Sequence, residues 1–118
     1  MDKKLVSNLK ETFFELLEII SDKSFQERIW VKGEGPEVSC SDEVLDFFLE
    51  YTEYALGNSE DWRFTKEQLE LLSELKAKVV EYNKRCPETD AEIVVDPKWD
   101  EIRKFAKVVY DKLKEEIK

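Results

Sequence analysis

Four segments of the chain carry apolar side chains at spacings of three and four residues, which is the pattern of an amphipathic α-helix. These segments are 3–21, 42–56, 65–85 and 97–117. Only three glycines and three prolines occur among the 118 residues, so long elements are favoured over many short strands. The pattern predicts a mainly α fold, a small four-helix bundle-like domain whose apolar stripes face one core.

Local signals place the ends of these helices. Ser41 and Asp96 are suitable N-caps for the second and fourth helices, and Thr65–Gln68 has the form of a capping box. Gly57 is expected to end the second helix, and Pro87 prevents the third from continuing.

The connection between the first two helices is expected to be irregular. A capping box over 24–27 predicts a short helical turn that ends at residue 29. Two glycines and a proline then predict an irregular loop over 30–40. The β-branched runs 29–31 and 93–95 can pair as a minimal two-stranded β patch, which would need support from the helices because two strands alone are marginal.

No repeat, low-complexity tract or linker interrupts this series, so residues 1–118 are expected to form a single helical domain. No segment approaches the roughly 20 apolar residues that a membrane span needs, and the first residues lack the apolar region of a signal peptide. The expected location is therefore the cytoplasm, without a membrane partner. Cys40 and Cys86 are expected to be reduced thiols, and the alternative is one disulfide in an exported protein.

Histidine is absent, which removes the usual general base near neutral pH, the usual partner of a nucleophile and the commonest transition-metal ligand. No calcium-loop pattern occurs, and Gly33–Pro36 lacks the third glycine or the lysine ending of a phosphate loop. The chain is therefore predicted to be non-catalytic, with no cofactor and no metal. A carboxylate- or metal-dependent enzyme is the alternative, and it needs acidic side chains that converge in a cleft.

The formal net charge of −9 can be assigned to one window, residues 33–62, which contains nine carboxylates and no basic residue. The rest of the chain carries equal numbers of acidic and basic side chains. A field of one sign attracts partners of opposite charge, and it opposes direct binding of nucleic acid, whose phosphates require a basic surface. The window therefore predicts a basic protein partner.

The second helix carries most of these acids on one face. Asp42, Glu43, Asp46, Glu50 and Glu53 fall within an arc of about 100°, because successive residues of a helix are rotated by about 100°. Like charges one turn apart repel, so the stripe stores roughly 1–2 kcal/mol of repulsion. Three interpretations stay open: a solvated face whose first-turn acids favour the helix dipole, an electrostatic docking face, or a metal site, which would need further ligands from outside this helix.

The docking interpretation gives a set of candidate partner-binding residues. Glu34 and Glu37 supply a rim in the preceding loop, and Tyr54 and Trp62 supply aromatic anchors. For Trp62, as for Trp30, packing in the core is the alternative. The full set is Glu34, Glu37, Asp42, Glu43, Asp46, Glu50, Glu53, Tyr54 and Trp62.

Three stretches of the sequence, Phe25–Val31, Gly33–Ser39 and Asp46–Phe48, resemble small bacterial immunity proteins encoded beside polymorphic or contact-dependent growth-inhibition toxins. The resemblance is confined to residues 25–48. It implies a cytoplasmic, antitoxin-like protein without catalysis of its own, which binds a cognate toxin, often a nuclease, and blocks its active site or its access to substrate. Nuclease grooves are cationic, so the acidic helix and loop would suit them. The alternative is a helical adaptor or subunit that binds its partner through an apolar groove.

Overall fold

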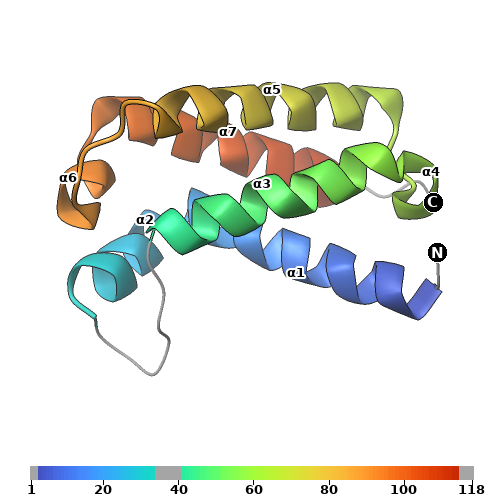
Figure 1. Ribbon diagram of the computed structural model, residues 1–118, viewed down its shortest axis with the longest axis horizontal. Coiled ribbons are helices and arrows are strands. Elements are labelled where there is room, and N and C mark those ends of the chain that lie inside the picture. The colour runs from blue at the N-terminus through green and yellow to red at the C-terminus, as the bar shows by residue number, and fades with distance from the viewer. Residues whose placement is uncertain (1–2, 34–40, 115–118) are drawn as a thin grey trace.

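A computed structural model describes residues 3–33 and 41–114 of the chain. Over these ranges the structure is mostly helical and contains no strand, which confirms the mainly α prediction (Figure 1). The elements in chain order are α1 (Lys3–Ser21), α2 (Lys23–Phe25), the π-helix η1 (Gln26–Val31), α3 (Ser41–Gly57), α4 (Ser59–Trp62), α5 (Lys66–Asn83), α6 (Asp90–Val94) and α7 (Pro97–Lys114).

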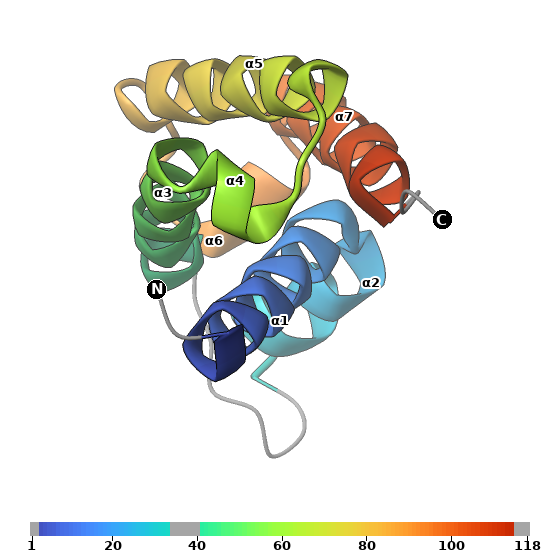
Figure 2. The same cartoon turned by 90° about the vertical axis from the view of Figure 1, so that its right-hand side faces the viewer.

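Within the described ranges, the four long helices α1, α3, α5 and α7 form an antiparallel bundle (Figures 1 and 2). Helix α1 packs against α3 and α7, and α5 packs against the same two helices from the opposite side. Each helix is therefore flanked by two neighbours and keeps one face outside the core. The short elements α2, η1 and α6 lie at one end of the bundle, and α4 lies at the other (Figure 1).

Aromatic side chains link the helices inside the core. The ring centre of Phe13 on α1 lies 6.1 Å from that of Phe48 on α3 and 5.7 Å from that of Trp62 on α4. Towards the other end, the rings of Trp30 and Trp99 are 6.3 Å apart. Since each buried aromatic side chain removes roughly 150–250 Å² from water, these contacts make a large part of the apolar burial that holds the bundle together.

Two of the three predicted signals at helix starts act as the sequence indicated, whereas Ser41, the predicted N-cap of the second helix, is the first residue of α3. Both hydrogen bonds of the predicted capping box form: the Thr65 N–H donates to Gln68 Oε1 at 2.8 Å, and the Gln68 N–H donates to Thr65 Oγ1 at 3.1 Å. Asp96 Oδ1 accepts the N–H of Lys98 at 3.0 Å at the start of α7. The Ser41 hydroxyl donates to the Asp90 carboxylate, which ties the first residue of α3 to α6.

The predicted two-stranded β patch is wrong. Residues 29–31 belong to the π-helix η1, and residues 93–94 belong to α6. Asp22 caps α2, the turn that leads into η1, by accepting the N–H of Phe25 at 3.1 Å, a role that the sequence pattern gave to Ser24. Because η1 and α6 pack against each other, the two β-branched runs do meet, but as helical segments. Ile29, Ile93 and Val94 are buried there, whereas Val31 and Val95 are exposed.

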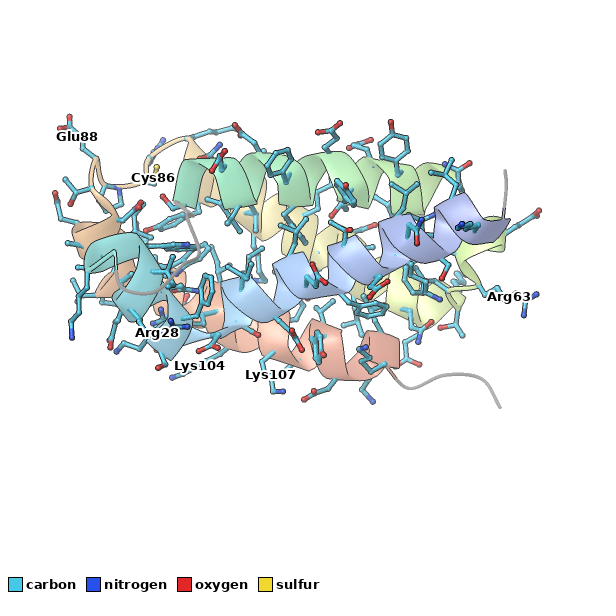
Figure 3. All side chains as sticks on the ribbon, turned by 90° about the horizontal axis from the view of Figure 1, so that it is seen from below. Arg28, Arg63, Cys86, Glu88, Lys104 and Lys107 are labelled. Carbon is cyan, nitrogen blue, oxygen red and sulfur yellow. The ribbon has the colours of Figure 1, made fainter. Side chains whose placement is uncertain are left out.

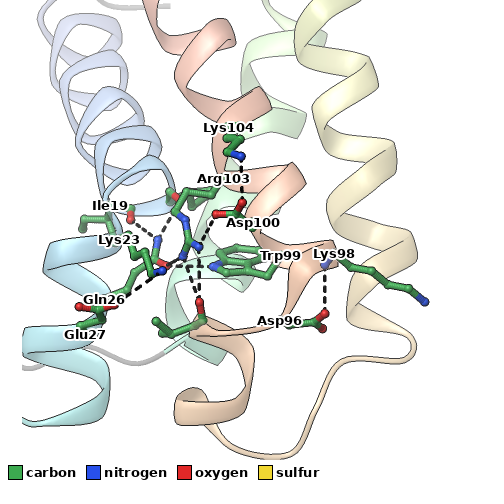
Figure 4. A network of polar contacts seen from close by, with 12 residues as sticks. Ile19, Lys23, Gln26, Glu27, Asp96, Lys98, Trp99, Asp100, Arg103 and Lys104 are labelled. Carbon is green, nitrogen blue, oxygen red and sulfur yellow. Dashed lines mark hydrogen bonds and ion pairs between the residues drawn. The ribbon is translucent and has the colours of Figure 1, made fainter.

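A buried polar junction holds this end of the bundle (Figure 4). The Gln26 amide is fully buried, and its Nε2 donates to the carbonyl oxygens of Ile19 and Ile20 at 2.7 and 2.8 Å. Its Oε1 accepts hydrogen bonds from Trp99 Nε1 and Arg103 Nη1, both at 2.9 Å. One side chain of η1 therefore joins the last turn of α1 to α7.

Replacing Gln26 with Leu should destabilise the protein by about 3 kcal/mol, because donors and acceptors on four neighbours would each lose a hydrogen bond. Urea unfolding followed by circular dichroism measures the loss. The control is Glu27→Leu at the adjacent, half-exposed position, which should change the unfolding free energy by less than about 0.5 kcal/mol. A loss below about 1 kcal/mol for Gln26→Leu would show that the junction is not required.

The Arg103 guanidinium enters this junction almost without solvent contact, with 5% of the residue exposed. Its Nη2 donates to Asp100 Oδ1 at 2.7 Å, and both terminal nitrogens lie within 3.5 Å of the Val94 carbonyl oxygen. The hydrogen bonds from Arg103 and Lys104 hold the pKa of Asp100 below its ordinary value. The carboxylate is thus the charged partner of a buried cation.

Asp100 should make stability depend on pH in the acid range. Its pKa is lower in the folded state than in the unfolded state, so its contribution is present above the unfolded-state pKa and is lost as the pH falls through the folded-state pKa. The difference in unfolding free energy between the wild type and Asp100→Asn should be largest near pH 7 and should shrink below about pH 4. Asp111→Asn, which removes only a surface pair with Lys107, is the control. A difference that does not change with pH would contradict this assignment.

Candidate functional site

The outward face of α3 gathers exposed acidic and aromatic side chains. Glu43, Asp46, Glu50 and Glu53 are all exposed, as the sequence pattern predicts for one face of this helix. The aromatic side chains of Phe47 and Tyr54 are exposed beside them, with exposed fractions of 47% and 44%. At about 100° per residue, these six side chains span an arc of about 120°. We call the six residues the α3 face: Glu43, Asp46, Phe47, Glu50, Glu53 and Tyr54.

The acids of the α3 face differ from those of α7 in having almost no cationic neighbours. On α7, Lys104 lies 3.1 Å from Asp100 and Lys107 lies 3.2 Å from Asp111, both one turn apart. Figure 3 shows these two lysines on the outer side of the bundle. Helix α3 contains no lysine or arginine. Its acids therefore depend on other elements for neutralisation.

One ion pair reaches the α3 face from a neighbouring helix. Lys76 of α5 donates to Glu53 Oε1, so Glu53 is paired at the edge that faces α5. Among the described residues, Glu43, Asp46 and Glu50 form no ion pair. The uncompensated negative charge is therefore concentrated over the first two and a half turns of α3.

Phe47 and Tyr54 give the α3 face two apolar contacts at a fixed separation. They are seven residues apart on one helix, which places them about 10.5 Å apart along its axis. Phe47 was not among the predicted partner-binding residues, although the sequence contains a signal for its exposure. Because the adjacent Phe48 belongs to the apolar stripe, a helix must turn Phe47 away from the core by about 100°.

Trp62 is not part of this surface. The side chain has an exposed fraction of 0% and packs against Phe13 and Phe64, with ring centres 5.7 and 6.0 Å away. The proposed role of Trp62 as a surface anchor is therefore corrected to core packing. Trp30 is also buried.

Other predicted residues are placed only in part. Glu34 and Glu37 lie outside the described residues. Asp42 belongs to the first turn of α3, but its side chain also lies outside the described part of the structure. The structure therefore describes six side chains of the predicted set: Glu43, Asp46, Glu50, Glu53, Tyr54 and Trp62. Trp62 is buried, and the other five are exposed.

The described ranges contain neither a metal-binding cluster nor a membrane-spanning helix. No group of three or more side chains of the metal-binding types is close enough together there to hold a metal ion. No helix there combines the length and the apolar character needed to cross a membrane.

No family model, curated protein or solved structure matches this chain. The resemblance to immunity proteins therefore stays a prediction, and the function must be argued from the surface itself.

The two aromatic candidates should respond differently to truncation. Trp62→Ala should cost about 3–5 kcal/mol of unfolding free energy because it leaves a cavity in the core. Tyr54→Ala should change stability by less than about 0.5 kcal/mol because Tyr54 lies on the surface, with 44% of the residue exposed. Urea unfolding of both variants measures the contrast. Similar losses for the two variants would show that Tyr54 has a structural role and is not available to a partner.

Proposed function

We propose that this chain is a non-catalytic, cytoplasmic binding protein that neutralises a cognate bacterial toxin by docking the α3 face into a cationic groove of the toxin. A basic nuclease domain is the partner whose surface chemistry suits this face best. The observation that carries the proposal is the combination of uncompensated acids with two exposed aromatic side chains on one rigid helix. Either feature alone would be ordinary for a surface helix.

The acids and the aromatic side chains would have different tasks in such a complex. Glu43, Asp46 and Glu50 would attract the toxin and orient it, which raises the association rate more than the final affinity. Phe47 and Tyr54 would be desolvated on docking and would slow dissociation, as aromatic anchors commonly do. The partner therefore needs two apolar pockets about 10.5 Å apart within a basic surface.

The preceding loop would extend the docking face. Glu34 and Glu37 come shortly before α3 in the sequence, and Asp42 lies in its first turn. We propose that these acids form the rim of the same interface. Inhibition would then follow from occupation of the substrate groove, which requires no chemistry from this chain.

The test is affinity capture from the native lysate, with elution across a salt gradient and identification by mass spectrometry. We expect recovery of a basic polypeptide whose nuclease activity is inhibited by the wild-type protein. Asp46→Lys with Glu50→Lys should reduce its association rate about tenfold at low salt and flatten the salt dependence. Phe47→Ala with Tyr54→Ala should mainly raise the dissociation rate.

A matched control uses another pair of exposed acids one turn apart. Glu11 and Glu15 lie on α1 and line a groove with α7 residues, away from α3. Glu11→Lys with Glu15→Lys changes the net charge by the same amount and should leave the association rate within about twofold. Equal effects of the two charge reversals would reject the α3 face as the docking site. Capture of only acidic or salt-insensitive partners would reject the toxin-neutralising function.

A further inference from the structure

A second surface feature lies between α5 and α7, on the other side of α5 from α3. It is a groove of about 830 Å³. Tyr82, Ile102 and Phe105 supply its apolar floor, and the small Ala77 opens it on the α5 side. The rim consists of charged side chains of both signs: Glu74, Lys78, Glu81, Arg85, Lys98 and Glu101.

Two contacts fix which rim residues face each other. The ring centres of Tyr82 and Trp99 are 5.4 Å apart, and Lys78 Nζ lies 5.4 Å from the ring centre of Phe105. Helices α5 and α7 are antiparallel (Figure 1). With the register that these contacts set, Arg85, two residues beyond the end of α5, comes close to the level of Lys98 at the start of α7. One helical turn further along the groove, Glu81 lies level with Glu101.

Like charges therefore face each other across the groove in two bands. Arg85 and Lys98 form a cationic band at one end, and Glu81 and Glu101 form an acidic band one turn away. Among the described residues, Arg85, Lys98 and Glu101 form no ion pair, and Glu81 has only Lys84 at 3.4 Å. A negative charge between Arg85 and Lys98 would complement the cationic band, and a positive charge between Glu81 and Glu101 would complement the acidic band.

We propose that this groove binds an amphipathic helix of a partner protein. The helix would place an acidic side chain between Arg85 and Lys98 and a basic side chain one turn further on, between Glu81 and Glu101. An apolar side chain after the basic one would pack on Phe105. A groove between two antiparallel helices has the width that accepts a third helix by ridge-and-groove packing, and helix-in-groove recognition uses anchors at this spacing.

The order of the two charge bands along the groove determines which helices can bind there. Ion pairs on a surface contribute little to affinity, but like charges brought together discriminate against the wrong partner. The bands therefore select the order of charges on the bound helix, and the apolar floor supplies most of the contact. This surface shares no residue with the α3 face, so the inference does not depend on the proposed toxin.

The test uses a labelled 15-residue helical peptide with a leucine stripe, one Glu in its first half and one Lys four residues later. Fluorescence anisotropy at low salt measures its affinity for the full chain, and amide chemical shifts of the chain locate it. We expect saturable binding with shifts confined to α5 and α7. Arg85→Glu with Lys98→Glu should weaken binding about tenfold, and a peptide with Lys in place of that Glu should restore it.

The control is Lys32→Glu with Lys66→Glu, which makes the same change in net charge at two exposed residues outside the groove. It should leave the affinity within about twofold. Absence of saturable binding, failure of the charge-exchanged peptide to restore it, or an equal loss with the control would overturn the proposal. So would a dimer in sedimentation equilibrium that Arg85→Glu with Lys98→Glu dissociates, because the groove would then be covered by a second copy of this chain.

Discussion

The Gln26 amide and the Arg103 guanidinium set the geometry of one end of the bundle. Both donate to carbonyl oxygens at the ends of short or long helices: Gln26 to Ile19 and Ile20 of α1, and Arg103 to Val94 of α6. The side-chain amide of Gln26 both donates and accepts hydrogen bonds, and the charge of Arg103 is balanced by Asp100. A buried cation is tolerated only with such partners, since its desolvation is costly. The positions of η1 and α6, and through Ser41 the start of α3, follow from this junction.

The pairing of acidic side chains with lysines differs between the exposed faces of the helices. On α7, Lys104 and Lys107 pair with Asp100 and Asp111 of the same helix, whereas the acids of α3 have one cationic partner among the described residues, Lys76. The exposed helix faces are therefore not equivalent solvated surfaces. Two features on opposite sides of α5 could engage partners: a single-sign face with aromatic side chains, and a groove with charges in alternating bands. A protein with both could be held by one partner while it blocks another.

Sequence patterns predicted the long helices well and the connections badly. The spacing of apolar residues placed α5 and α7, and the Thr65 capping box formed both of its hydrogen bonds, because these signals act over one or two turns. The β-branched runs were misassigned because a strand needs a partner of suitable length, whereas a capped helical turn satisfies its own backbone. Leu5 continues the apolar stripe of α1, yet 48% of the residue is exposed, so the stripe extends beyond the part of the helix that is buried.

The candidate site shows the same division. The sequence by itself determined that the acids share one face of α3, because helical rotation follows from residue number alone. Only the tertiary structure decided which aromatic side chains remain at the surface, since burial depends on which elements pack together: Phe47 is exposed, and Trp62 is enclosed by α1 and its neighbours. The groove with its charge bands was likewise beyond the sequence, because the register of α5 against α7 is set by long-range contacts between side chains. The periodicity of a helix determines which side chains share one of its faces. Packing between helices determines which of those faces remain exposed to solvent or to a partner.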